Sequence, residues 1–266
     1  MSYITWLFFI FLSAKGYAEP CLRKHFENGT VCVCNAQHCD TIELEAPQPG
    51  KNVVVYTSSA DGLRFQKKVQ QFVFNGKDLD EQITIGNQTY QQILGFGGAF
   101  TDSTGINIMK MDKGLQEKIL RSYFSKDGLE YSLGRVPIGG TDFSTRAYSY
   151  LSEEVDPQLK SFRLQVEDLK YKIPIIKKAR GLSEDLKLFS SAWTAPKWMK
   201  TNGKYTGPVS FLKEEYYQQW ADYHVRFLDA YSDQNVTFWG MTTGNEPLSG
   251  ILNMPVPSVA WVAPTQ

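Results

Sequence analysis

The sequence predicts an α/β fold in which parallel strands alternate with helices, and two observations carry this prediction. Between residue 91 and the C-terminus, four strand-like segments alternate with helical segments, and such an order builds a parallel sheet. Polar or aromatic residues also cluster where each of these strands ends, which is where the catalytic side chains of a (β/α)8 barrel lie. We therefore predict a barrel-type catalytic domain in this part of the chain.

The elements of this domain follow from hydrophobic periodicity. Strands are expected at residues 93–98, 131–138 and 186–191, and in a buried run that begins at Val236 and stops at Gly244. Helices are expected at residues 112–124, in a segment opened by Pro174, and at residues 213–231. The last helix carries an aromatic stripe at helical period: Tyr216, Trp220, Tyr223, Phe227 and Tyr231. The glycines at residues 95–98 do not form a dinucleotide fingerprint, because Phe100 stands where the third glycine is needed.

The segment around which the domain can be understood is Asn245-Glu246-Pro247. It follows directly on the last predicted strand, so the sequence places an amide and a carboxylate at a strand tip. Pro247 biases Glu246 away from the right-handed α region and fixes the turn. Glu246 is therefore a candidate catalytic carboxylate, although an isolated strand end with a solvated glutamate would have the same pattern.

Composition excludes some classes of partner and indicates a secreted protein. The 266 residues include 28 basic and 28 acidic side chains, so no nucleic acid is expected as a partner. An apolar block from Ile4 to Leu12, followed by small residues up to Ala18, predicts a signal peptide at residues 1–18. The block is too short for a bilayer, which needs about 20 apolar residues.

The four cysteines all lie near the N-terminus of the mature chain, at Cys21, Cys32, Cys34 and Cys39. Their positions allow three pairings, and the count alone does not choose among them. Disulfides are favoured over a zinc site because the secretory route is oxidising, although His25 and His38 keep zinc open as an alternative. Three acceptor motifs for N-glycosylation fit the same route: Asn28, Asn87 and Asn235.

A small antiparallel β region is predicted between the cysteines and the barrel. Short strand candidates occur at residues 53–56, 63–65, 69–74 and 82–85, with Asn75-Gly76 as the sharpest hairpin signal. Four short strands are too few to close a sandwich alone, so the region needs partners from elsewhere.

Several motifs in order resemble the family of lysosomal acid β-glucosidases (glucosylceramidases) of glycoside hydrolase family 30. They are Gly95–Asp102, Arg135-Val-Pro-Ile, Asp142-Phe-Ser, Ser191–Trp198, Lys200-Thr-Asn-Gly, Asn245-Glu-Pro and the cysteine cluster. The resemblance implies a retaining glycoside hydrolase with a (β/α)8 barrel, a disulfide-bonded N-terminal β region and a β-sandwich. It implies no metal and no cofactor.

Carried over by position, the resemblance implies a role for each of six residues. Glu246 matches the general acid/base, and Asn245 matches the amide that binds the 2-hydroxyl of the sugar. Asp142 and Trp193 match glucose contacts, Phe143 lines the pocket and Arg135 supports the carboxylates. The implied disulfides are Cys21–Cys32 and Cys34–Cys39. An alternative in which Asp142 and Glu246 form an inverting pair is weaker, because contact with sugar hydroxyls already accounts for Asp142.

The resemblance also indicates that the sequence is a fragment. Retaining hydrolysis needs a second carboxylate as nucleophile, and in this family it follows strand seven, whereas the sequence stops at Gln266 after about four strands. We thus expect a signal peptide at 1–18, a disulfide-bonded β region at 19–50, strands of an incomplete sandwich at 51–90 and the first half of a barrel at 91–266. The aromatic stripe at residues 216–231 is then expected to face missing partners.

The expected function is hydrolysis of glucosylceramide to glucose and ceramide, with an inert or merely glucoside-binding truncated product as the alternative. The implied partners are glucosylceramide presented on a membrane surface and a saposin-like activator protein. The implied location is the lysosome, at the luminal side of the membrane, with secretion as a second possibility.

Overall fold

The computed structural model describes residues 22–27, 29–35, 37–39, 45–63, 65–72 and 83–262. The chain divides into two compact units, one up to Thr41 and one from Ile42 onward. The predicted signal peptide, Cys21 and the predicted acceptor Asn28 lie outside the described residues. Among the described helices, none combines the length and the apolar character that crossing a bilayer requires.

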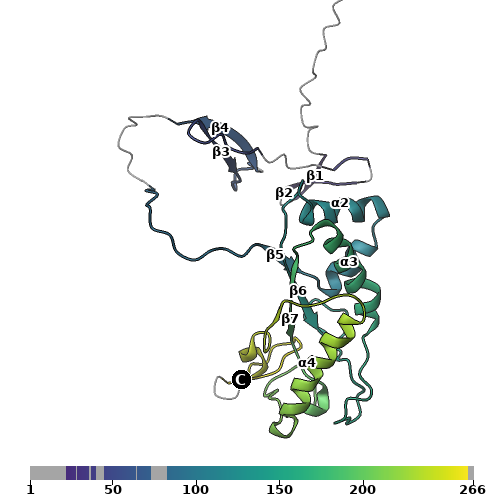
Figure 1. Ribbon diagram of the computed structural model, residues 1–266. Helices are drawn as coiled ribbons and strands as arrows, with labels where there is room; N and C mark the ends of the chain where they lie inside the picture. The colour runs from purple at the N-terminus through teal and green to yellow at the C-terminus, as the bar shows by residue number, and fades with distance from the viewer. Residues whose placement is uncertain are drawn as a thin grey trace, which may run out of the picture. The chain divides into compact units, whose positions relative to one another are not determined.

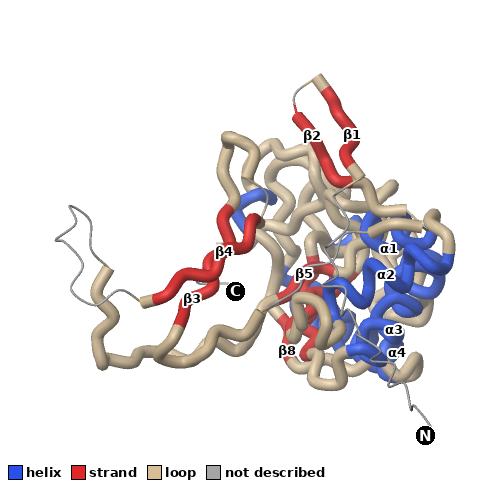
Figure 2. The backbone as a smooth tube through the Cα atoms, turned by 90° about the horizontal axis from the view of Figure 1, so that it is seen from above, coloured by secondary structure: helices blue, strands red, loops and turns tan. Residues whose placement is uncertain are grey.

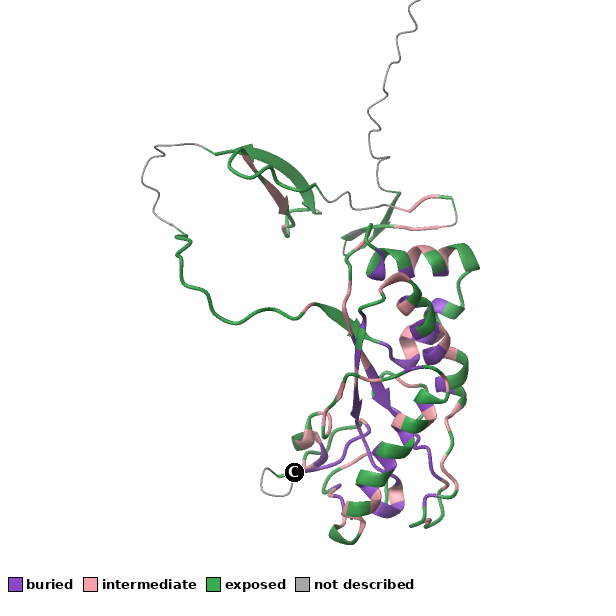
Figure 3. Ribbon diagram, viewed as in Figure 1, coloured by how far each residue is buried: buried purple, intermediate pink, exposed green. Residues whose placement is uncertain are grey.

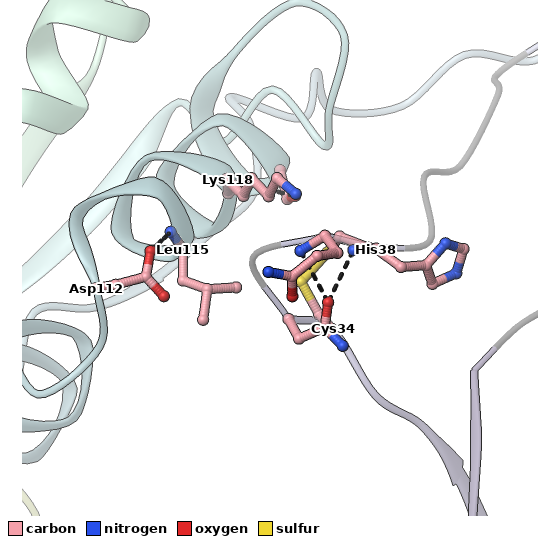
Figure 4. Close-up of a disulfide and its surroundings, with 9 residues drawn as sticks. Cys34, His38, Asp112, Leu115 and Lys118 are labelled. Carbon is pink, nitrogen blue, oxygen red and sulfur yellow. Dashed lines mark hydrogen bonds between the residues drawn. A yellow bond between two sulfur atoms is a disulfide. The ribbon is translucent and has the colours of Figure 1, made fainter.

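The first unit contains one antiparallel hairpin and a disulfide. Strands β1 (Arg23–Phe26) and β2 (Gly29–Cys32) pair with Arg23 opposite Cys32. The structure joins Cys34 to Cys39 by a disulfide bond, as drawn in Figure 4. Inside the loop that this bond closes, the Asn35 side chain accepts a 2.8 Å hydrogen bond from the backbone of His38. The pairing of Cys21 with Cys32 stays a prediction, because Cys21 lies outside the described residues.

A second antiparallel hairpin opens the other unit. Strand β3 (Asn52–Thr57) pairs along its whole length with β4 (Gln66–Gln71). The predicted strand at residues 63–65 is wrong, because Leu63 lies in the connecting turn, where its carbonyl accepts a hydrogen bond from Ser59 N. The predicted strand at 82–85 is also wrong for its described part, in which Ile83 and Ile85 are exposed and unpaired.

A four-stranded parallel sheet forms the centre of the barrel portion (Figure 1). Its strands lie side by side in chain order: β5 (Gly97–Ala99), β6 (Leu133–Ile138), β7 (Lys187–Ala192) and β8 (Gly240–Met241). Parallel registers place Ala99 beside Arg135, and Arg135 beside Phe189. The prediction of a parallel α/β sheet is therefore confirmed.

Helices cover one face of this sheet, as Figures 1 and 2 show from two directions. They are α1 (Asp102–Met109), α2 (Lys113–Phe124), α3 (Ile173–Leu182) and α4 (Tyr217–Ser232). A π-helical segment (Glu167–Lys172) leads into α3, and 3-10 turns occupy Lys197–Met199, Glu214–Tyr216 and Pro247–Gly250. Helix α2 begins where the Asp112 side chain accepts a hydrogen bond from Leu115 N, a contact drawn in Figure 4.

The core lies between the sheet and these helices (Figure 3). Alternate residues of β6 and β7 point into it, so that Val136, Ile138 and Leu188 are fully buried. The expectation that the aromatic stripe of α4 would be exposed is wrong, because Tyr223, Phe227 and Tyr231 have no exposed surface. Tyr150 and Phe238 pack against the stripe, so the described residues of this chain cover it.

Two predicted strands differ from the structure at their ends. The first strand is Gly97–Ala99 and not 93–98, since Ile93, Leu94 and Phe96 precede the pairing and are exposed. Gly97 allows the pairing, because a Cβ there would lie 1.7 Å from the Leu133 carbonyl oxygen. The run after Val236 is not a wholly buried strand either. Strand β8 is limited to Gly240–Met241. Trp239 and Met241 are 59% and 46% exposed, because among the described residues β8 has a neighbour on one side only.

Candidate active site

The candidate active site is a cavity of about 230 Å³ at the C-terminal ends of the parallel strands. It contains all six side chains that the sequence singled out. They come from β6, from the loop after it, and from the segments after β7 and β8. The lining residues are Arg135, Asp142, Phe143, Trp193, Asn245, Glu246, Ser249, Val256 and Pro257. The cavity is smaller than pockets for drug-sized ligands, which span about 300–1,000 Å³.

Arg135 forms the hydrogen-bonded centre of one wall. It stands on β6 between Gly134 and Val136, which face the helices, so strand alternation turns its side chain to the cavity face. Its guanidinium donates to Ser191 Oγ at 2.9 Å and to Asn245 Oδ1 at 2.8 Å. Asn245 is therefore held in a fixed orientation, with its oxygen already occupied by a cation.

The same guanidinium stacks on Trp193. The Arg135 Cζ lies 4.4 Å from the centre of the indole ring, and Trp193 is only 7% exposed. One face of the indole thus contacts arginine instead of lying open to a ligand. Burial lowers the pKa of Arg135, while the carboxylates of Glu246 and Asp142 act in the opposite direction. Arg135 remains a cation between two acidic side chains, which fits the supporting role expected for it.

The backbone before Glu246 extends the sheet beyond β8. Thr242 N donates to the Ser190 carbonyl at 2.9 Å, and Asn245 N donates to the Ala192 carbonyl at 2.8 Å. Glu246 then takes a left-handed conformation, with φ 42° and ψ 63°. This agrees with the expectation that proline keeps Glu246 out of the right-handed region, although a left-handed conformation is uncommon for glutamate. Ser249 Oγ donates to Glu246 Oε2 at 3.3 Å.

Asp142 and Phe143 enter the cavity from the loop that follows β6. Both are exposed, Phe143 by 56%. Within the described residues the Asp142 carboxylate has no hydrogen-bond donor, so its oxygens are available to a ligand that carries hydroxyl groups. The backbone on either side is firmly held: Phe143 N donates to Thr141 Oγ1, and Thr141 N donates to Ser144 Oγ, both at 2.9 Å.

Sequence reasoning missed five residues of the site. Ser249, Val256 and Pro257 complete the lining, and they belong to a loop without periodicity that only its position after Glu246 could have indicated. Ser191 and Thr242 lie behind the lining residues and support Arg135. Ser191 Oγ accepts hydrogen bonds from Arg135 and, at 2.6 Å, from Thr242 Oγ1. Ser191 could have been found from alternation, because it precedes Trp193 by two residues.

A cavity that combines two carboxylates, an amide and an arginine at the C-terminal ends of parallel strands is typical of the catalytic domains of TIM-barrel enzymes. The model of the glycosyl hydrolase family 30 TIM-barrel domain matches residues 93–266, and the chain belongs to this family. The resemblance seen in the sequence is thereby confirmed.

Relatives with curated names agree. The chain is 42% identical over 255 residues to putative glucosylceramidase 4 of Caenorhabditis elegans, covering 94% of this chain and 49% of that protein. It is 40% identical to the lysosomal acid glucosylceramidase of Mus musculus, covering 88% and 47%. The chain therefore spans about half the length of these relatives.

Solved structures show the same fold. SrfJ from Salmonella typhimurium aligns with a TM-score of 0.73 at 28% identity, covering 81% of this chain and 47% of SrfJ. An endo-β1,6-glucanase aligns with a TM-score of 0.56 at 32% identity, covering 62% and 38%.

Proposed function

We propose that this chain is the portion of a glucosylceramidase-type retaining β-glucosidase that carries its acid/base residue. The complete enzyme would hydrolyse glucosylceramide to glucose and ceramide in sphingolipid catabolism. The observation that carries the proposal is the gathering of Arg135, Asp142, Trp193, Asn245 and Glu246 around one small cavity. These residues come from three separate strand ends, and each has the chemistry that a glucoside needs.

In this proposal Glu246 protonates the glycosidic oxygen and later removes a proton from water. Asn245, whose oxygen is taken by Arg135, offers its amide group to the 2-hydroxyl of the sugar. Asp142 accepts hydrogen bonds from other hydroxyls, and Phe143 and Trp193 provide apolar contact. The half-buried guanidinium of Arg135 stabilises the negative charge of Asp142 and Glu246.

The nucleophile is proposed to come from barrel sequence that these 266 residues do not contain. A retaining mechanism needs two carboxyl groups about 5–5.5 Å apart. Among the described residues, the carboxylates that line the cavity are Asp142 and Glu246. The sugar-binding role assigned to Asp142 leaves the position of the nucleophile open, and the relatives are about twice as long as this chain.

The two carboxylates that line the cavity are also compatible with a second candidate function, which is binding without hydrolysis. A product of this length would at most bind a glucoside in the cavity and would not hydrolyse it. Among the described residues of the cavity, Asp142 is assigned to sugar hydroxyls and Glu246 to proton transfer, which leaves no further carboxylate for the glycosyl-enzyme bond. A predicted signal peptide and the exposed acceptor side chains of Asn87 and Asn235 support a secretory route, with the lysosome lumen as destination. Glucosylceramide on a membrane surface and a saposin-like activator protein are the proposed partners.

The test begins with sequencing the transcript beyond the codon for Gln266 and expressing the longest protein that it encodes. This protein is expected to release glucose from glucosylceramide vesicles, with the β anomer as the first product. The 266-residue chain is expected to bind 1-deoxynojirimycin, a positively charged glucose mimic, and to release no glucose from the glucosylceramide vesicles. Absence of turnover by the long form and of binding by both forms would overturn the proposal.

A further inference from the structure

The loop that carries Asp142 and Phe143 is anchored to a buried ion cluster under the first helix. The cluster consists of Asp102, Asp168 and Lys172, all 1% exposed or less. Lys172 Nζ lies 2.8 Å from Asp168 Oδ1 and 3.5 Å from Asp102 Oδ1. Burial acts to lower the pKa of Lys172, but the two carboxylates outweigh it, so that its pKa is raised and the ammonium stays charged.

The two carboxylates of this cluster face different parts of the fold. Asp168 accepts hydrogen bonds from the hydroxyls of Tyr150 at 2.8 Å and Tyr231 at 2.7 Å, both within the helical core. Asp102 instead accepts a 2.5 Å hydrogen bond from Ser144 Oγ, which belongs to the loop of the active site. Asp168 therefore connects the cluster to the helical core, whereas Asp102 connects it to the loop that forms part of the cavity wall.

The first turn of α1 holds the loop on both sides of Asp142. Asp102 fixes Ser144, and the Ser144 hydroxyl accepts the Thr141 N–H at 2.9 Å. The next residue of the helix, Ser103, donates to the Phe143 carbonyl through its backbone N–H at 3.0 Å and through its hydroxyl at 2.8 Å. Every residue from 141 to 144 except Asp142 is thus tied down, and Asp142 is presented to the cavity.

A second contact comes from Tyr148. Its hydroxyl donates to Asp102, with distances of 3.2 and 3.1 Å to the two oxygens, and its backbone carbonyl accepts from Gly140 N at 3.0 Å. Gly139 adopts a φ of +75°, and a Cβ on Gly140 would lie 2.8 Å from Tyr148 N. The chain after β6 can pass Tyr148 this closely only with glycine at these positions.

Resting on the proposed function, we propose that Asp102 is a positioning residue for sugar binding, which acts through Ser144 to hold Asp142 and Phe143 in their binding geometry. A preformed loop loses less conformational freedom when the ligand binds, so affinity depends on this anchor. A hydrogen bond from a hydroxyl to a buried carboxylate is charge-assisted and is therefore a strong link between Ser144 and Asp102.

The test uses the 266-residue chain, with hydrogen exchange of the amides at residues 140–144 and binding of 1-deoxynojirimycin as its two measurements. Ser144→Ala removes the link and leaves the ion cluster in place. It is expected to raise the exchange rate of the Thr141 and Phe143 amides and to weaken binding, each by about tenfold. Ser190→Ala is the matched control, because Ser190 is buried and its hydroxyl has no hydrogen-bond partner among the described residues.

A second pair of variants separates positioning from general stability. Asp102→Asn and Asp168→Asn both remove one charge from the cluster, so both are expected to lower the melting temperature. Only Asp102→Asn is expected to accelerate exchange in the loop at a temperature where both variants are folded. Wild-type exchange and binding in Ser144→Ala, or equal loop exchange in the two aspartate variants, would overturn the inference. Failure of both the wild-type chain and the longest encoded form to bind, together with no turnover by the long form, would overturn the proposed function instead. The exchange measurement would still decide whether Asp102 anchors the loop.

Discussion

The guanidinium of Arg135 donates a 2.8 Å hydrogen bond to the side-chain oxygen of Asn245, the residue directly before Glu246. The two residues belong to segments that are not neighbours in the sheet, because β7 lies between β6 and β8. The contact therefore bridges the cavity face of β7 and fixes the tip of β8 from two strands away. The charged side chain of Arg135, in the middle of β6, thereby helps to orient the proposed catalytic segment at Asn245 and Glu246.

Replacement of Arg135 by lysine is expected to loosen this bridge. Lysine is a point charge that cannot reproduce the planar stack on Trp193 together with both hydrogen bonds. We expect Arg135→Lys to weaken binding of 1-deoxynojirimycin by about tenfold or more, as measured by titration calorimetry. Arg121→Lys is the control, since Arg121 is half exposed in a surface ion pair and should change stability by less than about 0.5 kcal/mol. Equal effects of both variants would contradict the proposed bridge.

Glu246→Gln, made in the longest encoded form of the protein, is expected to affect the hydrolysis of glucosides to a degree that depends on their leaving group. An amide cannot donate a proton to the glycosidic oxygen, and general acid catalysis typically contributes about 10²–10⁴-fold. Glucosides with poor leaving groups should therefore lose activity by that order, while activated aryl glucosides lose far less in their first step. Glu184→Gln, an exposed glutamate outside the cavity, should leave both rates unchanged. Equal losses on both substrate types would remove Glu246 from the acid/base role.

Asp142→Ala is expected to reduce sugar binding without unfolding the chain. The carboxylate is exposed and has no hydrogen-bond donor among the described residues, so its removal breaks no internal hydrogen bond and only weakens the electrostatic interaction with Arg135. Each hydrogen bond to a charged group is worth about 1.5–3 kcal/mol, which predicts a loss of affinity of about ten- to hundredfold. The melting temperature should stay within about 2 °C of wild type. A cooperative loss of structure would instead show that Asp142 is structural.

Much of this fold could be predicted because its helices have strong periodicity. The stripe of Trp220, Tyr223 and Phe227 predicted α4, with an N-terminal end that differs by four residues from the one observed. Asp112 marked the start of α2. Helix α1 was missed because its sequence, Asp102–Met109, contains serine, threonine and glycine, which are weak helix formers. Strand β5 was displaced because the pattern favoured the apolar residues before it, whereas pairing depends on the close approach that glycine allows.

Six of the residues that line the candidate cavity could be named from the sequence, but the contacts that support them could not. Strand ends and motif resemblance sufficed to name Asp142, Trp193 and Glu246, because these lie where parallel strands place catalytic groups. The ion pair of Asp102 with Lys172 joins residues 70 positions apart on α1 and on the π-helical segment before α3. No local pattern specifies such a contact, which follows only from how the helices pack on the sheet.

The stability of the chain is expected to depend on pH through Lys200. This lysine is 1% exposed, and its ammonium donates to Thr194 Oγ1 at 2.9 Å, to the Tyr205 carbonyl at 3.0 Å and to the Ser258 carbonyl at 2.7 Å. Thr194 follows Trp193 and Ser258 follows Pro257, so Lys200 ties together two walls of the cavity. It has no ion pair among the described residues, and burial lowers its pKa from 10.5 to about 7.

The direction of this pH dependence follows from the number of protons that the folded and unfolded chains bind. Between pH 7 and 10.5 the unfolded chain holds a proton on Lys200 that the folded chain has lost, so the free energy of unfolding rises with pH by up to about 1.4 kcal/mol per unit. Below pH 7 the full cost of the buried charge is present. Urea unfolding between pH 6 and 9 should show this rise, and Lys200→Met should remove it, whereas Lys177→Met on the exposed face of α3 should keep it. The same slope in Lys200→Met and wild type would contradict this assignment.

The chain alone is expected to associate through β8 and to show no β-glucosidase activity. Strand β8 pairs with β7 on one side, and on the other side its edge is free among the described residues. Trp239 and Met241 expose 59% and 46% of their surface at this edge, and an apolar open edge is a template for pairing between chains. Sedimentation of the secreted chain should therefore show concentration-dependent oligomers.

A charge at this edge should suppress the association, because a lysine there would have to be desolvated when two edges pair. Trp239→Lys is expected to shift the chain toward the monomer. Val225→Lys replaces a 54% exposed residue on α4, outside the strand edge, and is not expected to change the association. Loss of association in both variants would point to general apolar contact. A wild-type chain that stays monomeric, melts in one sharp transition and hydrolyses glucosides until Glu246 is changed to glutamine would show that this half of the barrel is self-sufficient.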